Sequence, residues 1–185
     1  MFSEIMLFTY SQCKEKYGSQ YQLNKAIKNA ELYQLEKGVY SDRKRESDIC
    51  VISFKYPCAV LTLNSAFYYY GLTDTIPEKY ILATERGAAK ITDGRVIQKF
   101  ENSGTVQLGA VDVEYQDNIL HIYDRERLLL ELLRNKTKLP FDYYKEVLSN
   151  FRKIIEELNM QDIQDYAYEL PKSAMIMELL QLEVL

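Results

Sequence analysis

The chain has 185 residues, of which 47% are hydrophobic and 27% are charged, so it is long enough for one hydrophobic core with a small appended module. Its net charge of −4 argues against a protein that coats nucleic acid or an anionic membrane along its whole length. Residues 1–46 carry eight Lys or Arg and six Asp or Glu, which leaves a net charge of −6 on the other residues. We therefore expect a weakly basic N-terminal module on an acidic body.

The sequence contains no pattern of a membrane or metal protein. No apolar run reaches the length of a transmembrane helix, and residues 1–8 lack the positively charged start of a signal peptide. The three cysteines, Cys13, Cys50 and Cys58, have neither the spacing of a zinc site nor that of a CxxC pair. We expect reduced thiols in a cytoplasmic protein that has no cofactor and no membrane contact.

Two short helices are predicted first. One covers residues 11–17, with Thr9 or Ser11 as its N-cap, and a short break follows it. The second covers residues 20–29 and is capped by Ser19. Its inward stripe, at i, i+3 and i+4, consists of Leu23, Ala26 and Ile27.

A tight β-hairpin is predicted after these helices. Its strands are residues 32–35 and 39–40, and Lys37-Gly38 forms the turn, since glycine accepts the positive φ that a two-residue turn requires. Two helices followed by a hairpin are typical of a winged helix-turn-helix. The charged segment 41–48 then reads as a linker, so we place the domain boundary after residue 46.

The second domain, residues 47–185, is predicted to be a mixed α+β domain with a central sheet and C-terminal helices. A strand at 49–54 precedes a helix at 59–70 that ends at Gly71. Four further strands cover 79–84, 95–100, 106–115 and 118–123. The helices that follow cover 125–134, capped by Asp124, then 140–158, 162–170 and 171–185. The fold class of the whole chain is therefore α+β, with a winged helix-turn-helix as residues 1–46.

Four blocks of the sequence resemble one bacterial family. They are Leu32–Tyr40 (LYQLEKGVY), Leu63–Leu72 (LNSAFYYYGL), Tyr80–Gly87 (YILATERG) and Tyr123–Arg134 (YDRERLLLELLR). In this order they are similar to the wing, a helix end, a strand with its turn and a helix of the AbiEi-type antitoxins. Those proteins are the regulatory halves of abortive-infection toxin–antitoxin pairs. Where their recognition helix often ends in Gly, this chain has Asn29-Ala30, which predicts a left-handed Asn29.

The resemblance implies a regulator without enzymatic activity. Members of the family are described as a winged helix-turn-helix that represses its own operon, followed by a domain that counters a nucleotidyltransferase-like toxin. We therefore expect an antitoxin and transcriptional autorepressor that serves phage defence. Its expected partners are an inverted-repeat operator, bound by two copies or a homodimer, and the toxin, countered directly or indirectly. The family usually has a full first helix where this chain has only residues 1–8.

Candidate DNA-binding residues lie on the polar face of the second helix and around the hairpin. Gln22, Asn24 and Lys25 can pair with base edges in the major groove. Five further cations can contact phosphates: Lys14, Lys28, Lys37, Arg43 and Lys44. The alternative is a degenerate winged helix that binds a protein partner, and the acidic Glu31 and Glu36 beside the wing favour it.

Two weaker patterns remain. Asp112 and Glu114 share one face of a strand, as the carboxylates of a metal-dependent nucleic-acid enzyme would, although paired acids on a strand are more often solvated. Arg86 and Lys90, in the turn after a strand, are candidates for a phosphate or partner contact. The alternative for that turn is a structural role in which Arg86 pairs with an acid. No catalytic residue and no metal ligand is predicted.

Several other residues are expected to serve the fold. On a helix the aromatic residues 67–70 point in different directions, so most of them are expected to pack and not to stack on bases. His121 lacks the neighbours of a catalytic histidine. Arg127 and Glu131 are expected to pair on a helix surface, and the apolar last helix is expected to close the core.

Overall fold

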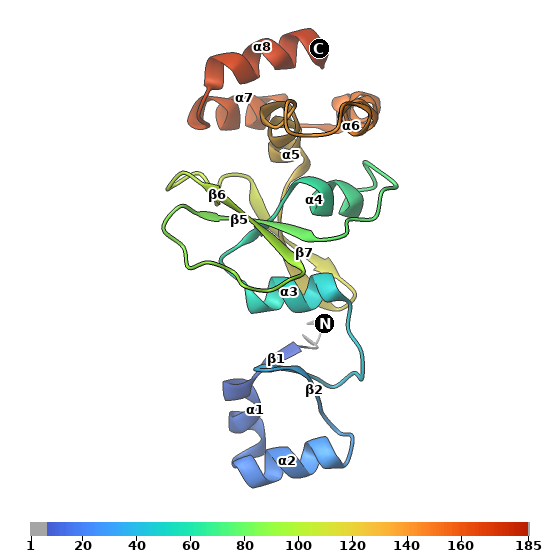
Figure 1. The fold of residues 1–185 in the computed structure, drawn as a ribbon, viewed down its shortest axis with the longest axis vertical. Helices are drawn as coiled ribbons and strands as arrows, with labels where there is room; N and C mark the ends of the chain where they lie inside the picture. The colour runs from blue at the N-terminus through green and yellow to red at the C-terminus, as the bar shows by residue number, and fades with distance from the viewer. Residues whose placement is uncertain (1–6, 185) are drawn as a thin grey trace. The chain divides into compact units, whose positions relative to one another are not determined.

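The chain folds into helices and two β-sheets, one of three strands and one of five, which confirms the expected α+β class (Figure 1). The computed structural model describes residues 7–184. Residues 1–6, which belong to the segment where no signal peptide was expected, lie outside that range. The chain divides into two compact units. The first runs to Pro57 and includes Asp112–Leu120, and the second comprises Cys58–Val111 and the residues from His121 onward.

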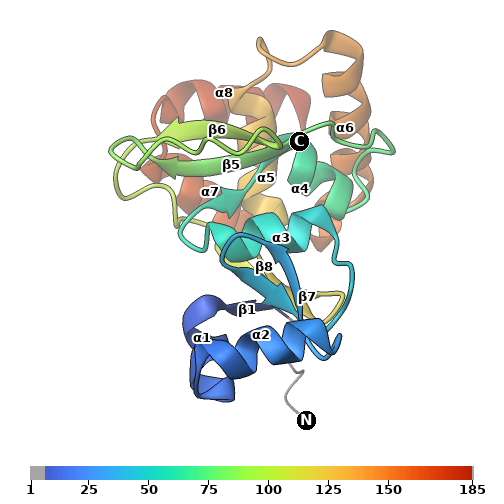
Figure 2. The same ribbon diagram turned by 60° about the horizontal axis from the view of Figure 1, so that its bottom comes forward.

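The first unit begins with a strand and two helices, which lie close together in Figure 2. Strand β1 (Leu7–Thr9) leads into α1 (Tyr10–Tyr17), and α2 (Gln20–Lys28) follows. Thr9 caps α1 in a capping box with Gln12: the Thr9 hydroxyl accepts from the Gln12 amide, and the Gln12 side chain accepts from the Thr9 amide at 2.8 Å. The Ser19 hydroxyl caps α2. Both helices and the caps Thr9 and Ser19 are as predicted, whereas β1 was not expected.

The hairpin completes a three-stranded sheet. Strands β2 (Tyr33–Glu36) and β3 (Val39–Ser41) are joined by a turn in which Gly38 has φ +83°, as predicted. The strand order is β1-β3-β2, and both pairs are antiparallel. Because β1 precedes the two helices and pairs with the second strand of the hairpin, one sheet holds both ends of the helical pair.

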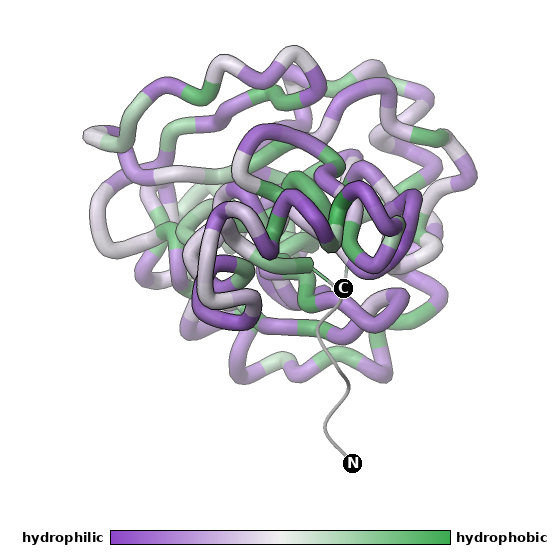
Figure 3. The backbone as a smooth tube through the Cα atoms, turned by 90° about the horizontal axis from the view of Figure 1, so that it is seen from below, coloured by the Kyte–Doolittle hydropathy of each residue, from purple (hydrophilic) through white to green (hydrophobic). Residues whose placement is uncertain are grey.

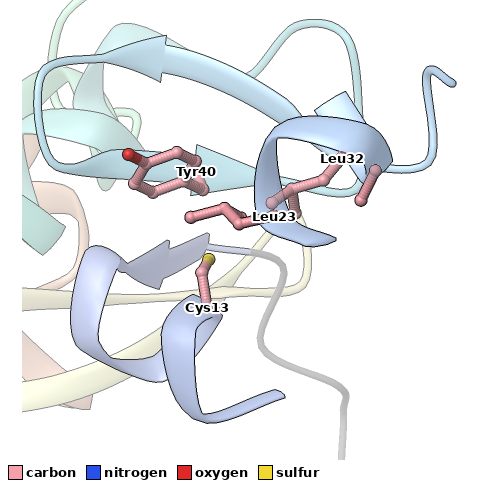
Figure 4. Packing of buried hydrophobic residues seen from close by; sticks show 5 residues of the cluster. Cys13, Leu23, Leu32 and Tyr40 are labelled. Carbon is pink, nitrogen blue, oxygen red and sulfur yellow. The ribbon is translucent and has the colours of Figure 1, made fainter. Parts of the chain in front are cut away.

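A small apolar cluster joins the helices to the hairpin (Figure 4). Its buried members are Cys13, Leu23, Ala26, Leu32 and Tyr40, and Phe8, Tyr17 and Ile27 cover its edge. Leu23 and Ala26 are thus buried as predicted, and Ile27 is half-buried. Since one face of α2 is used by this cluster, its other face is left for solvent or a partner.

The end of α2 differs from the prediction. Ala30, not Asn29, has the left-handed conformation, with φ +59°, while Asn29 has φ −83°. The Ala30 amide donates to Ile27 O at 3.1 Å and the Glu31 amide donates to Ala26 O at 3.0 Å, which is the bonding of a Schellman motif. Helix α2 ends at Lys28, one residue earlier than expected, with Asn29 as its C-cap, so the left-handed position that follows the cap is Ala30 and not Asn29.

Helix α3 (Asp48–Lys55) replaces the strand predicted at 49–54, which was wrong. Its β-branched residues favour a strand locally, but Cys50, Val51, Ile52 and Ser53 are all buried. Because α3 is buried on several sides, its sequence does not show the alternation of polar and apolar residues that marks an amphipathic helix. Tertiary packing overrides the weak local preference for a strand.

The first unit extends past residue 46, where the domain boundary was expected. Polar contacts connect the segment after β3 with the turn between β7 and β8. Glu46 accepts from Asn118 at 3.3 Å, and the Cys50 thiol lies 3.8 Å from Tyr115 O. Helix α3 and residues 112–120 therefore belong with the winged module in one compact unit.

The larger sheet has the strand order β6-β5-β4-β8-β7. Its strands are β4 (Val60–Leu61), β5 (Tyr80–Glu85), β6 (Val96–Glu101), β7 (Ala110–Tyr115) and β8 (Asn118–Tyr123). The four predicted strands are confirmed, although β7 begins later than expected. Strand β4 occupies the start of the helix predicted at 59–70, so the helix there is only α4 (Leu63–Tyr69), ended by Gly71 with φ +66°.

The remaining helices follow β8 and appear in orange and red in Figure 1. They are α5 (Arg125–Arg134), α6 (Phe141–Lys153), the 3-10 turn η1 (Ile155–Glu157), α7 (Met160–Glu169) and α8 (Ser173–Glu183). Asp124 caps α5 as predicted, and α6 ends at Lys153 and not at 158. Helix α8 buries Ile176 and Leu180, as expected for a helix that closes the core.

Hydrophobic and hydrophilic residues alternate along the backbone tube in Figure 3. Within residues 7–184, no helix combines the length and the apolar character that crossing a membrane requires.

Arg127 and Glu131 form an ion pair inside the second unit. The pairing was predicted, at 3.0 Å between Arg127 Nε and Glu131 Oε1, but the surface location was wrong because both side chains are fully buried. The Arg127 guanidinium also donates to the carbonyl oxygens of Thr105 and Leu108, at 3.0 and 2.9 Å. Seven consecutive residues of α5, 127–133, are buried, so this helix has no solvent face over nearly two turns.

Glu131 is ionised in this interior. Burial alone would raise the pKa of its carboxyl, but the positive charges of Lys99, Arg127 and Arg134 lower that pKa to about 2. Because the folded-state pKa lies below the ordinary value of 4.5, the ionised carboxylate stabilises the fold fully above about pH 4.5. That contribution is lost as the pH falls from there toward 2.

We predict that Glu131→Gln lowers the free energy of unfolding at pH 7 by about 3 kcal/mol or more, because it leaves buried cations without their anion. The deficit relative to wild type should shrink as the pH is lowered from 4.5 toward 2. Urea denaturation across this pH range measures both effects. Glu157→Gln is the matched control, since Glu157 pairs with Arg125 at 2.9 Å near the surface and should contribute less than about 1 kcal/mol. Equal losses in the two variants would contradict the assignment.

Candidate nucleic-acid interface

The outer face of α2 carries the base-reading candidates. Gln22, Asn24, Lys25 and Lys28 are all exposed, opposite the buried Leu23 of the same helix. The structure therefore brings these four predicted residues together on one helix face. Amide and ammonium groups on an exposed helix are the groups that pair with purine and pyrimidine edges in the major groove.

A chain of hydrogen bonds orients the start of this face. The Tyr10 hydroxyl of α1 bonds the Gln20 side-chain oxygen, and Gln20 Nε2 donates to Asn24 Oδ1 at 2.9 Å. Since Asn24 uses its oxygen in this bond, its amide group is presented as a donor. Tyr10 and Gln20 were not predicted as positioning residues. Their contact joins two different helices, and the hydrophobic pattern of one helix does not show which residues of another helix it meets.

Tyr21 is a second residue that the sequence reading missed. It lies in the first turn of α2 and is 74% exposed. Its place outside the inward stripe of Leu23, Ala26 and Ile27 was visible in the sequence. An exposed aromatic ring beside amides and lysines adds a contact surface for a sugar or a thymine methyl group.

The wing presents one free positive charge at its tip. Lys37 is exposed in the turn of the hairpin. The neighbouring Glu36 is half-buried and pairs with Lys55 of α3, at 2.8 Å between Nζ and Oε2. The negative charge of Glu36, which favoured a protein partner over DNA, is therefore compensated inside the same unit.

Glu31 remains an acidic neighbour of the helix face. With Gln22, Lys25 and Asn29 it lines a shallow open pocket of about 210 Å³. Asn29 Nδ2 donates to Glu31 Oε1 at 3.1 Å. A carboxylate at this position repels a phosphate, but it can accept a hydrogen bond from the amino group of a base.

The remaining phosphate candidates fall into two groups. Arg43 is already engaged, since its Nη2 lies 2.7 Å from Asp117 Oδ2, and this hydrogen bond raises the pKa of the guanidinium. Lys14 on α1 and Lys44 after β3 are exposed. Lys14 and Lys44 thus retain accessible charges, whereas Arg43 serves to tie the segment after β3 to the turn at Asp117.

Arg86 and Lys90 are exposed in the loop between the parallel strands β5 and β6. The Gln98 side chain holds this loop, accepting from the Ile91 amide at 2.8 Å and donating to Ala89 O at 3.0 Å and to Thr84 Oγ1 at 2.9 Å. Both cations belong to the second unit, and they are not part of the α2 face.

The structure also places the side chains that were considered for metal binding, catalysis and base stacking. Asp112 and Glu114 are exposed on β7, and in the described part of the chain no group of three His, Cys, Asp or Glu side chains is placed to hold a metal. His121 Nε2 lies 2.8 Å from Gln107 Oε1. Of the aromatic run 67–70, Phe67 is fully buried against the Phe151 ring, as expected for packing.

All three cysteines are free thiols, as expected. Cys13 and Cys50 are buried, and burial raises the pKa of both. Cys58 is exposed.

Comparison with known proteins adds a fold relationship. No protein-family model matches the chain, and no curated protein sequence matches it. Its structure is similar to the crystal structure of the Rv2827c protein from Mycobacterium tuberculosis, with a TM-score of 0.60 and 16% sequence identity. The similarity covers 95% of this chain and 71% of the Rv2827c chain. At this identity the likeness concerns the fold alone.

We predict that Gly38→Ala loosens the wing that carries Lys37, because an L-residue is strained at φ +83° by about 1 kcal/mol or more. Hydrogen exchange of the backbone amides in Val39–Ser41 should accelerate by about fivefold or more. Gly94→Ala is the control, since the backbone of Gly94 is not in the left-handed region and a Cβ there meets open space. Unchanged exchange in Gly38→Ala would show that the turn tolerates a side chain.

Proposed function

We propose that this chain is an AbiEi-type antitoxin that represses its own operon. The observation that carries the proposal is the outer face of α2, where Gln22, Asn24, Lys25 and Lys28 are exposed while the inner face is buried in the module core. Together with the β1-β3-β2 sheet and the Lys37 wing, this is the layout that a winged helix-turn-helix uses to enter the major groove. The four sequence blocks that resemble the family support the same conclusion.

In this proposal α2 is the recognition helix. Its first two turns read base edges through Gln22, Asn24 and Lys25. Lys14, Lys28, Lys37 and Lys44 contact phosphates on either side and fix the register. Two copies bind an inverted repeat whose half-sites are roughly 34 Å apart, one turn of the duplex.

The second unit is proposed to counter a nucleotidyltransferase-like toxin, in a cytoplasmic, non-enzymatic role. The support for this part is the resemblance of the blocks at 63–72, 80–87 and 123–134, all of which lie in that unit.

The DNA-binding proposal predicts that Lys25→Ala combined with Lys28→Ala weakens binding to the region upstream of the chain's own gene. Lys28 is the phosphate contact of the two and releases a counterion, so the slope of log affinity against log salt should fall by about 1, and the loss of Lys25 should lower the affinity further. Fluorescence anisotropy across a salt series with the full chain measures the slope. The matched control is Lys145→Ala combined with Lys153→Ala, which removes the same charge from exposed positions of the second unit.

An equal loss of affinity in both double variants would mean that only net charge matters and would reject α2 as the reading helix. Absence of binding by the wild-type chain at low salt would reject the DNA-binding proposal altogether.

A second candidate function is a protein-interaction module whose winged helix does not bind DNA. It is favoured by Glu31, which lies among the α2 side chains, and by Arg43, whose charge is taken up by Asp117. Binding to a protein partner without any salt-sensitive binding to the upstream region would establish it. Divalent-dependent cleavage that is lost in Asp112→Ala would instead indicate an enzyme.

The antitoxin part of the proposal predicts that a nucleotidyltransferase-like gene lies beside the gene for this chain. Co-expression of the chain should restore growth to cells that express that neighbour. If neutralisation resides in the second unit, the Lys25→Ala and Lys28→Ala variant should restore growth as fully as wild type does. Growth arrest that the wild-type chain does not relieve would refute the antitoxin assignment and leave the DNA-binding measurement unaffected.

A further inference from the structure

The second unit contains an open pocket of about 380 Å³ that none of the predicted site residues lines. Its walls come from the end of β6, the end of α5 with the turn after it, and the start of α8. This volume lies in the range of about 300–1,000 Å³ that is usual for small-molecule sites.

Positive charge dominates the pocket. Its lining includes Lys99, Arg134, Lys138 and Lys172, against one carboxylate, Glu101. Lys138 and Lys172 are exposed, so their charges are available to a ligand. Lys99 and Arg134 are paired with Glu101 and with the buried Glu131, so the exposed Lys138 and Lys172 supply most of the charge that can attract a group with more than one negative charge.

Ion pairs connect the side chains at the floor of the pocket, which comprises Lys99, Glu101 and Arg134. Glu101 is buried and bonds both Lys99 and Arg134, the latter at 3.1 Å. Lys99 also contacts the buried Glu131 at 2.9 Å. In this network the three cations Lys99, Arg127 and Arg134 face the two carboxylates Glu101 and Glu131, so one positive charge remains in excess.

Burial acts on the cations of this floor. It lowers the pKa of Lys99, although the charge of Glu131 opposes the shift. A desolvated ammonium group gains more from an added anion than an exposed one does, because fewer water molecules compete with the ligand.

The rim at α8 carries an unusual backbone. Lys172, the residue before the helix, has the left-handed conformation, with φ +65° and ψ 36°, which is uncommon for a side-chain-bearing residue. Within the described residues no side chain caps the first turn of α8. The first amides of α8 therefore have no side-chain acceptor, and amides at a helix start also favour a negative group.

Two large apolar residues, one from β6 and one from α8, are also among the pocket residues. Phe100 is 47% exposed at the edge strand β6, and Met175 of α8 lines the same pocket. Because successive side chains of a strand point to opposite faces of the sheet, the Phe100 ring points away from the face that Lys99 and Glu101 share, and the apolar contribution to the pocket is small.

We propose that this pocket binds a small phosphate-bearing molecule, with the phosphates on Lys138, Lys172 and Arg134. The shared chemistry is the phosphate chain, and a nucleoside triphosphate and inorganic pyrophosphate are the two sources that carry it. Phosphate is favoured over a single carboxylate because several point cations and a helix start converge on one place. The site lies in the second unit and does not depend on DNA binding by α2.

Isothermal titration of the full chain with pyrophosphate, ATP and adenosine tests the site. Pyrophosphate and ATP should bind, with affinity that falls as salt is raised, and adenosine should not. Lys138→Ala combined with Lys172→Gly should weaken pyrophosphate binding at least tenfold. Glycine is chosen at 172 because it accepts the left-handed backbone, so the fold should be at least as stable as wild type in thermal denaturation.

Lys79→Ala combined with Lys145→Ala is the matched control, since both lysines are exposed in the second unit and neither lines the pocket. It should leave the affinity within twofold of wild type. Tighter binding of ATP than of pyrophosphate would identify the ligand as a nucleotide, and equal or weaker binding of ATP would show that the site recognises the phosphate chain alone. Pyrophosphate binding that is absent at low salt, or unchanged in the pocket variant, would overturn the proposal.

Discussion

The buried ion pair of Arg127 and Glu131 is the interaction on which the second unit depends. Through Arg127 it ties α5 to the Thr105 and Leu108 carbonyls, just before β7, and through Glu131 it ties α5 to Lys99 of β6. Those two strands are the edges of the five-stranded sheet. Buried ions are costly unless every partner is in place. Gly109 shows how closely the chain passes, since a Cβ there would lie 2.6 Å from Arg127 Cβ.

The same network shapes the surface of the second unit. Because Glu131 and Glu101 do not fully balance Lys99, Arg127 and Arg134, the ion pairs that hold α5 leave positive charge at the pocket between β6 and α8. A net acidic chain thus acquires a local cationic site as a by-product of its core. The first unit is built differently, since its small apolar cluster uses one face of α2 and leaves Gln22, Lys25 and Lys28 exposed on the other.

Local features of the fold were predictable from sequence and long-range features were not. Thr9, Ser19 and Asp124 were recognisable as caps because each bonds an amide three residues away. The exposed α2 face followed from its amphipathic period. The pairing of Arg43 with Asp117 spans 74 residues and has no sequence pattern. The burial of α3 and of the Arg127–Glu131 pair was not predicted for the same reason. The segments that cover a helix are distant from it in the sequence.

The ion pairs of the first unit limit the charge that the proposed DNA contact could use. Lys55 neutralises the charge of Glu36, and Asp117 neutralises that of Arg43. One negative and one positive charge near the wing are therefore already paired within the unit. The positive electrostatic potential around α2 and the wing then comes from a few exposed lysines, and the negative charge of Glu31 reduces it. Few phosphate contacts give a modest electrostatic affinity. Under the proposed function, discrimination between operator and other DNA would rest on the amides of α2, and two copies on one operator would compensate for the weak binding of each.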